Sequence, residues 1–197
     1  MSANHAAFNL IFRFVENYVS PIAGRISSQR HVMAIRDGFI SAMPFMIVGS
    51  FLLVFAYPPF SPDTTWGFAR AWLDMAKQFE GQILTPFDMT MGIMSIYICA
   101  AIAYNLGKHY VKTHQLDPFM CAMLSLMAFL LVAAPKTKGT LPVDSLGGTG
   151  IFTAILVAIY CVEMMRFLKA HNIGIRLPDQ VPPMIKNSFD LLIPVLV

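Results

Sequence analysis

The sequence predicts an all-α protein, a polytopic membrane helical bundle with four complete spans and the start of a fifth. Hydrophobic residues make up 56% of the 197 residues and charged residues only 13%, whereas about 25% of a typical soluble domain is charged. Asp, Glu, Lys and Arg are absent from residues 38–62, 89–107, 118–135 and 145–162. A soluble helix carries charges on its solvent face, and a membrane span needs about 20 apolar residues. Four such windows therefore favour a membrane protein.

Composition excludes several other classes of protein. The net charge of +3 is too small, and the Lys and Arg residues are too scattered, for a nucleic-acid-binding protein. The apolar content excludes intrinsic disorder, and three cysteines cannot form a disulfide scaffold in which all are paired. A soluble all-helical domain with a large core is the alternative that remains, and solubility without detergent would establish it.

The charge-free windows place the four spans at about 39–57, 89–106, 119–134 and 150–165. A fifth apolar stretch begins at residue 191, but it is too short to cross a bilayer. Residues 1–37 are expected to form a cytoplasmic or interfacial segment, and residues 38–197 the membrane domain. Ten Lys and Arg residues flank one side of the predicted bundle and four the other, which predicts a cytoplasmic N-terminus.

Segments outside the spans also carry structural signals. Trp66 and Trp72 lie in a helix-like run over residues 66–79, which favours a helix at the membrane–water boundary because tryptophan is enriched there. Near the N-terminus, apolar residues at helical spacing predict an amphipathic helix, either on the membrane interface or packed against the bundle; they are Phe8, Ile11, Phe12 and Val15.

The chain shows no self-sufficient catalytic site, and we expect neither a catalytic residue, a metal nor a cofactor. The three cysteines fall inside predicted spans and should be inert small apolar residues; they are Cys99, Cys121 and Cys161. His109 and His114 lack neighbouring ligands for a metal. The glycines of residues 147–150 predict a turn, because no Lys-Ser or Lys-Thr follows them. Glu163 lies three residues before Arg166, and a local ion pair is the simplest role for it.

The most unusual stretch is residues 176–183, with sequence RLPDQVPP. Its prolines forbid a regular helix and hold the backbone extended. Such a rigid segment beside a bundle either lines a solute path or connects two helices. The residues alone favour the connector.

Several motifs, in order along the chain, resemble one family. They are HVMAIRDGFI at 31–40, MP at 43–44, VG at 48–49, GIMS at 92–95, IAY at 102–104, LPD at 177–179, VPP at 181–183, SF at 188–189 and IP at 193–194. Together they resemble the membrane component, IIC, of bacterial sugar phosphotransferase systems of the lactose, cellobiose and chitobiose class. The resemblance covers residues from about 31 to 194.

This resemblance implies a multi-pass permease in the bacterial cytoplasmic membrane. It would accept a β-linked disaccharide, such as cellobiose or chitobiose, which a cytoplasmic IIB partner phosphorylates, with IIA acting indirectly. Membrane lipid and, in the complete protein, a second copy forming a homodimer are the other partners implied. Candidates for the sugar path are Pro178, Asp179, Val181 and Pro182, and candidates for fixing the start of the first span are Arg36, Asp37, Gly38 and Pro44.

By the same resemblance, the chain corresponds to the N-terminal half of such a permease. The sugar-binding histidine and glutamate of the family belong to the second half, so we expect this sequence to be a truncated or incomplete one. The alternative is a membrane scaffold or partner-binding protein that keeps the bundle but does not transport.

Overall fold

The structure is a computed structural model, and it describes residues 15–133, 143–173, 181, 182, 185, 189 and 191–196. Within these residues all regular structure is helical, as the composition predicted. The segments are η1 (Val15–Val19), α2 (Ser20–Ser27), α3 (Arg30–Ala56), α4 (Gly67–Thr90), α5 (Met94–His114), α6 (Pro118–Ala133), η2 (Val143–Ser145), η3 (Gly148–Gly150), α7 (Ile151–Ala170) and α9 (Leu192–Leu196).

Three helical stretches of the described chain are long and apolar enough to cross a membrane: Arg30–Ala56, Glu80–His114 and Gly148–Ala170. They correspond to the first, second and fourth predicted spans. The third predicted span coincides with α6, which has 16 residues and would rise only about 24 Å, less than the ~30 Å hydrocarbon core. The count of four complete spans and the start of a fifth therefore stays a prediction. The short helix α9, which begins at Leu192, lies in the predicted fifth apolar stretch.

Helix ends differ from the predicted span ends because the helices continue past the apolar windows. α3 begins at Arg30, so the predicted boundary between residues 37 and 38 falls inside a helix. α5 continues to His114 and α7 to Ala170, and each carries basic residues in its last turn. Cations are favourable at helix C-termini, and hydropathy alone does not register these polar turns.

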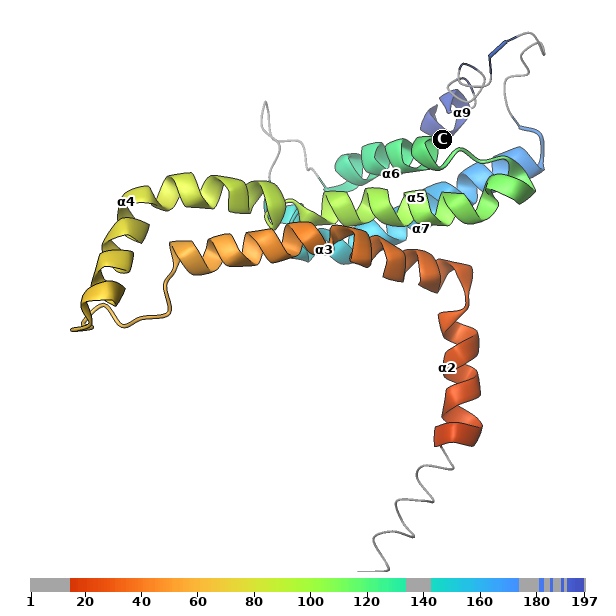
Figure 1. The fold of residues 1–197 in the computed structure, drawn as a ribbon. Coiled ribbons are helices and arrows are strands. Elements are labelled where there is room, and N and C mark those ends of the chain that lie inside the picture. Colours follow the sequence, from red (N-terminus) through yellow and green to blue (C-terminus); the bar gives the residue numbers. More distant parts are fainter. Residues whose placement is uncertain are drawn as a thin grey trace, which may run out of the picture.

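α5 is the central helix and packs against α3, α6 and α7 (Figure 1). Small residues allow close approach: Gly38 of α3 lies against Ile102, and Gly107 lies against the start of α6 at Pro118 and Cys121. α3 and α6 run antiparallel to α5, and α7 runs parallel to it.

The core between these helices consists of fully buried apolar side chains, with Ile98, Ile102 and Leu106 from α5 and Phe129 from α6 among the largest. The three cysteines are buried and free, as predicted. Ala103, Gly107, Ala154 and Ala158 are also buried. Their four-residue spacing therefore serves helix contacts, in addition to reflecting the composition of membrane helices.

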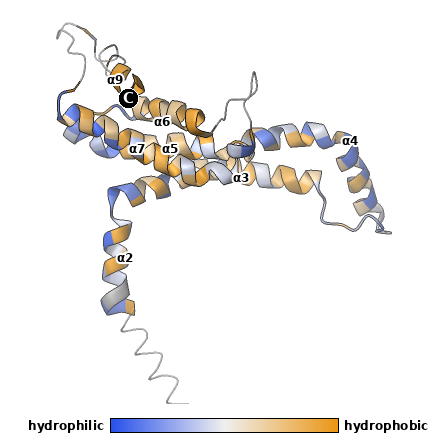
Figure 2. Cartoon of the chain, turned by 180° about the vertical axis from the view of Figure 1, so that it is seen from behind, coloured by the Kyte–Doolittle hydropathy of each residue, from blue (hydrophilic) through white to orange (hydrophobic). Residues whose placement is uncertain are grey.

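Much of the outer surface of α3 is apolar, including Ile40, Ile47, Phe51 and Val54, which are all exposed. Figure 2 shows this hydrophobic colouring along α3, in contrast with the mixed colouring of α2 and α4. An apolar face of this extent on a helix of 27 residues fits contact with lipid.

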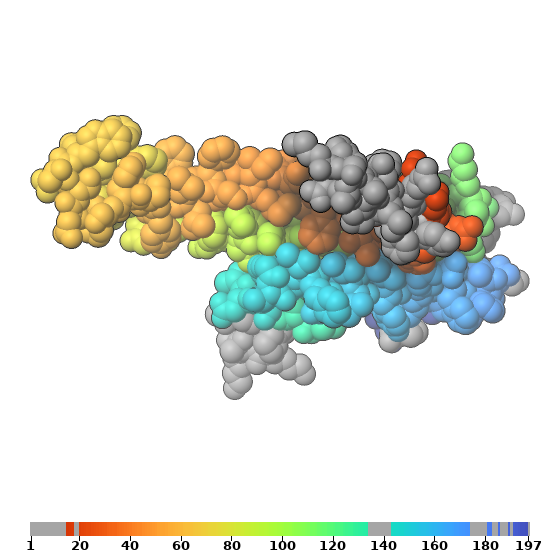
Figure 3. Space-filling model, turned by 90° about the horizontal axis from the view of Figure 1, so that it is seen from below, coloured from red at the N-terminus to blue at the C-terminus, as the bar shows by residue number. Residues whose placement is uncertain are grey.

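α3 and α4 form a hairpin that extends beyond the rest of the bundle (Figure 3). α4 bends, and its second part continues toward α5 (Figure 1); it contains Gly81 and Pro86, the residue types at which helices bend. The prediction of a helix after Trp66 is right, although the helix runs to Thr90, well past residue 79. At the opposite end α2 projects from the bundle with no buried residue.

The segment 143–150 consists of two short 3-10 turns, which confirms the predicted turn at residues 147–150. It packs on the start of α5, where the Ser95 amide donates to the Leu146 carbonyl at 3.0 Å. Of the predicted N-terminal amphipathic helix, only Val15 is described and it is 45% exposed; Phe8, Ile11 and Phe12 lie outside the described residues.

Candidate functional site

A polar cluster joins three helices at the end of the bundle where α3 begins and where α5 and α7 end; we call this the basic end. Its centre is Glu163 of α7. The Glu163 carboxylate accepts a hydrogen bond from the Tyr110 hydroxyl of α5, lies 2.9 Å from His31 Nε2 of α3 and forms an ion pair with Arg166 at 2.8 Å. One carboxylate thus links α3, α5 and α7.

Two guanidinium groups also lie close to the Tyr110 ring. The guanidinium carbons (Cζ) of Arg30 and Arg166 lie 5.3 Å and 5.2 Å from the centroid of the Tyr110 ring, within the range of a cation–π interaction. His114 meets the same ring edge-on, with 5.5 Å between centroids. Tyr110 itself is fully buried, so a buried aromatic ring flanked by two guanidinium groups lies at this end of the core.

The register of the helices explains this meeting of distant residues. Gly38 packs on Ile102, and Gly49 packs on Met91, so α3 and α5 pair in opposite directions and Arg30 comes opposite Tyr110. The predicted pairing of Glu163 with Arg166 is confirmed. Its contacts with His31 and Tyr110 were missed, because residues more than fifty positions apart give no local spacing signal.

Chemically, the cluster is closed. The Glu163 carboxylate oxygens are already occupied by the contacts with Tyr110, His31 and Arg166. The Glu163 side chain is 23% exposed and the His31 side chain is 31% exposed. Across the described part of the chain, no three His, Cys, Asp or Glu side chains gather in a way that could hold a metal ion. The arrangement suits holding three helix ends together more than binding a ligand.

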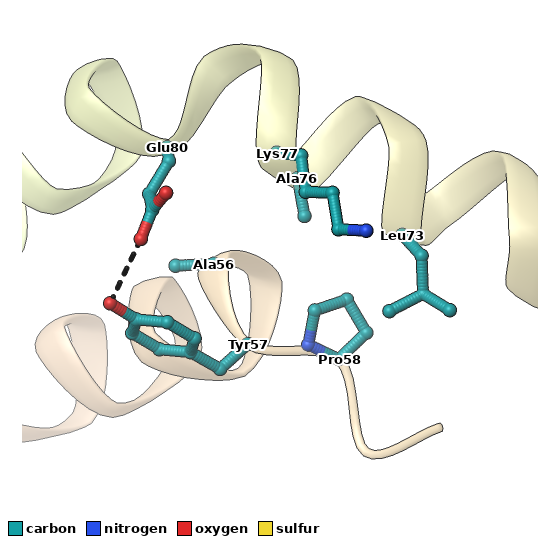
Figure 4. A pocket seen from close by; sticks show the side chains of 7 residues that line it. All are labelled: Ala56, Tyr57, Pro58, Leu73, Ala76, Lys77 and Glu80. Carbon is teal, nitrogen blue, oxygen red and sulfur yellow. Dashed lines mark hydrogen bonds between the residues drawn. The ribbon is translucent and has the colours of Figure 1, made fainter. Parts of the chain in front are cut away.

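A pocket lies at the opposite end of the molecule, which we call the hairpin end, between the end of α3 and α4 (Figure 4). Its volume is about 310 Å³, and it is lined by Ala56, Tyr57, Pro58, Leu73, Ala76, Lys77 and Glu80. The Tyr57 hydroxyl donates to Glu80 at 3.1 Å. This hydrogen bond raises the pKa of Tyr57, which directly follows the apolar helix Arg30–Ala56, above its usual value.

Aromatic residues surround this end of the hairpin. Phe60 lies 5.8 Å from Trp66 and 5.7 Å from Trp72, centroid to centroid, and Trp72 is 5.7 Å from Phe55. The Trp72 indole donates to the Phe55 carbonyl at 3.2 Å. Trp66 and Phe68 are about 60% exposed, which suits rings that lie at a membrane–water boundary.

The residues predicted to fix the first span lie between the first turns and the middle of α3. Arg36 forms an ion pair with its neighbour Asp37 at 2.8 Å. Gly38 is buried against α5, and Pro44 sits in the middle of the helix. Of these four, Gly38 has a clear packing role. Their role in setting where the span enters the membrane stays a prediction.

The structure describes two of the four predicted sugar-path residues. Val181 is half-buried and Pro182 is exposed; the Pro182 carbonyl accepts the Ile185 amide at 3.0 Å. Pro178 and Asp179 lie outside the described residues. The predicted sugar path therefore stays a prediction.

Comparison with known proteins decides the family. Residues 36–197 match the family model described as "Phosphotransferase system, EIIC". This chain belongs to the EIIC family. With its long apolar helices, it is a multi-pass integral membrane protein.

Relatives of this EIIC chain cover most of its length. It is 36% identical to the cellobiose-specific EIIC component of Geobacillus stearothermophilus, over 92% of this chain and 42% of that protein. It is 34% identical to the lichenan permease IIC component of Bacillus subtilis, over 94% of this chain and 42% of that protein. The chain thus spans less than half the length of these relatives.

A solved structure agrees in fold. The crystal structure of the transporter ChbC, the IIC component from the N,N'-diacetylchitobiose-specific phosphotransferase system, matches with a TM-score of 0.75 and 35% identity. The match covers 93% of this chain and 44% of ChbC. An EIIC fold for this bundle is therefore supported by sequence and by structure.

Proposed function

We propose that this chain supplies the N-terminal helices of an EIIC sugar permease in the bacterial cytoplasmic membrane. The permease carries a β-linked disaccharide such as cellobiose or chitobiose inward. A cytoplasmic IIB partner, which receives its phosphoryl group from IIA, phosphorylates the sugar. The observation that carries this proposal is the joint match to a cellobiose-specific EIIC component and to the ChbC structure, each over more than nine-tenths of this chain.

Within that permease, the described helices suit a scaffold. Their core is apolar and their principal polar cluster is satisfied internally at the basic end. The excess of Lys and Arg at that end supports its placement in the cytoplasm. The sugar path would run near the proline-rich segment that includes Val181 and Pro182, and a homodimer is the expected assembly of the complete permease.

Split-protein complementation tests the proposal. This chain is co-expressed, in a host that lacks cellobiose uptake but has the IIA and IIB components, with a separate polypeptide for the rest of the Geobacillus relative. We expect uptake of radiolabelled cellobiose and recovery of its phosphorylated form. The second polypeptide alone is the control and should give neither.

The alternative function, a membrane scaffold without transport, makes the opposite prediction. In that case the two polypeptides would copurify in detergent, yet no labelled cellobiose would enter the cells. Stable assembly without uptake in this experiment would therefore reject the permease proposal.

A further inference from the structure

An exposed groove lined by α3, α5 and α6 is the feature that the permease proposal does not use. Its volume is about 430 Å³, and its lining is Ser41, Phe45, Tyr97, Ala100, Ala101, Tyr104, Asn105, Lys108 and Ala122. Phe45 and Tyr97 stack at one end with 4.5 Å between centroids. Lys108 lies at the other end, toward the basic end of the bundle.

Three of the polar side chains in the groove already donate hydrogen bonds to the backbone. Ser41 donates to the Asp37 carbonyl at 2.7 Å, Tyr97 to the Met89 carbonyl at 2.8 Å and Asn105 to the Ala101 carbonyl at 2.9 Å. A sugar needs several free hydrogen-bonding groups along its length, and these side chains have committed donors to the protein's own backbone. Over most of its length the groove therefore presents an apolar and aromatic surface.

One cation marks the groove's polar end. The Lys108 ammonium lies 4.6 Å from the centroid of the Tyr104 ring, is exposed and forms no ion pair with any described residue. Asp37, one turn from Ser41 on α3, is the nearest carboxylate along that helix face, and Arg36 neutralises it at 2.8 Å. The groove thus combines a long apolar surface with a single positive charge at one end.

The dimensions match one leaflet of a membrane. Tyr97 and Lys108 are eleven residues apart on α5, which corresponds to about 16 Å of helix and to about half of a ~30 Å hydrocarbon core. Lys108 is the first charged residue after the window 89–107, which places it at the edge of the apolar layer. A chain in the groove would run from that edge to near the bilayer midplane.

We propose that this groove binds an anionic phospholipid, with its phosphate at Lys108 and one acyl chain along Tyr104, Ala101 and the Phe45–Tyr97 pair. Charge complementarity selects the anionic head group, because anionic lipids attract basic residues at the cytoplasmic surface. The apolar length of the groove selects a long acyl chain. This site concerns the membrane placement of the bundle and does not depend on sugar transport.

Native mass spectrometry of the full 197-residue chain tests this site with dioleoyl phosphatidylglycerol and dioleoyl phosphatidylcholine as probes. We expect phosphatidylglycerol to bind more tightly, and Lys108→Gln to lower its affinity about fivefold. Lys77→Gln, which removes the same charge from exposed α4, is the matched control and should bind as the parent does. Equal losses in the two variants would overturn the proposal.

Two further measurements test the acyl-chain part. Ala101→Phe fills the groove and should weaken both lipids, with circular dichroism to confirm folding. If that variant does not fold, the length of the lipid's acyl chains is varied instead. Dioctanoyl phosphatidylglycerol should then bind to the parent protein more weakly than the dioleoyl lipid does. Equal affinity for the two chain lengths rejects the groove as an acyl site.

Other occupants of the groove give distinct results in the same experiment. Displacement of phosphatidylglycerol by cellobiose would assign the groove to sugar. A dimer mass that Ala101→Phe removes, without a change in lipid binding, would assign it to a second copy of the chain. Either result rejects the lipid site.

Discussion

The two ends of the molecule are held in different ways. At the basic end, one carboxylate on α7 joins a histidine, a tyrosine and an arginine from three helices that already pack together. At the hairpin end, α3 and α4 extend beyond the bundle and are held by aromatic contacts and two exposed hydrogen bonds. A shared carboxylate thus links the helices at the basic end, where they are also fixed by packing, whereas exposed aromatic contacts predominate at the hairpin end.

This contrast predicts unequal sensitivity to mutation, with the largest effect at the contact that sets the register of the basic end. Gly38→Ala places a Cβ against Ile102, including its backbone, and should destabilise the bundle by about 1–3 kcal/mol. Thermal unfolding in detergent, followed by circular dichroism, measures the effect. Gly24→Ala in exposed α2, where nothing lies nearby, is the control and should be neutral or slightly stabilising.

The second largest effect is expected at the centre of the polar cluster. Glu163→Ala leaves Arg166 and the Tyr110 hydroxyl without their acceptor, and should cost about 2 kcal/mol. Glu163→Gln keeps an acceptor for Tyr110 and should cost less. The same unfolding assay ranks the variants; if Glu163→Ala unfolds like the parent protein, the cluster does not hold the helix ends.

A smaller effect is expected at the hairpin end. Trp72→Phe keeps an aromatic ring but removes the hydrogen bond to the Phe55 carbonyl, and should cost about 1 kcal/mol or less. Because the chain has only two tryptophans, Trp66 remains as the fluorescence probe. A blue or red shift of its emission, with unchanged unfolding of the bundle, would show that the hairpin end responds separately. A loss as large as that of Glu163→Ala would remove the contrast between the ends.

The smallest effect concerns Tyr57 and is seen through pH. Its pKa is raised above the ordinary value of a tyrosine, first by the hydrogen bond to Glu80, so the phenol keeps its proton and that bond up to higher pH than a free tyrosine would. The stability that this hydrogen bond contributes is fully present below the ordinary pKa of tyrosine. It is lost as the pH rises through the raised pKa of Tyr57. Ultraviolet difference absorbance of tyrosinate, compared with Glu80→Gln, checks this: the variant should ionise Tyr57 at lower pH. An unchanged titration would show that the bond is absent in solution.

Sequence reasoning located the helices better than the contacts between them. The charge-free windows lie within or overlap α3, α5, α6 and α7, because exclusion of charge is a local property of a span. The helices continue past the predicted spans where charged turns follow, as at Arg30 and Lys169, and the span boundaries themselves stay a prediction. α4 likewise continues through Pro86 to Thr90, past the predicted helical run of residues 66–79.

Part of the polar cluster was readable because Glu163 and Arg166 are one helical turn apart. His31 and Tyr110 were not, because their meeting depends on how Gly38 seats α3 against α5. The groove at Lys108 was likewise invisible, since its walls come from three helices. Inter-helix register is a property of packing, and a single sequence does not display it.

The position of Glu163 on α7, the long helix nearest the C-terminus in the described part of the chain, has a consequence for biosynthesis. His31 and Tyr110 enter the membrane region long before this carboxylate is translated, and they meet it only when α7 arrives beside α5. The cluster therefore closes only after α7 has been made, when the apolar contacts of α3, α5 and α6 are already available. We expect the cluster to form only in a chain whose α7 has inserted in register with α3 and α5, because Glu163 must then lie beside both His31 and Tyr110.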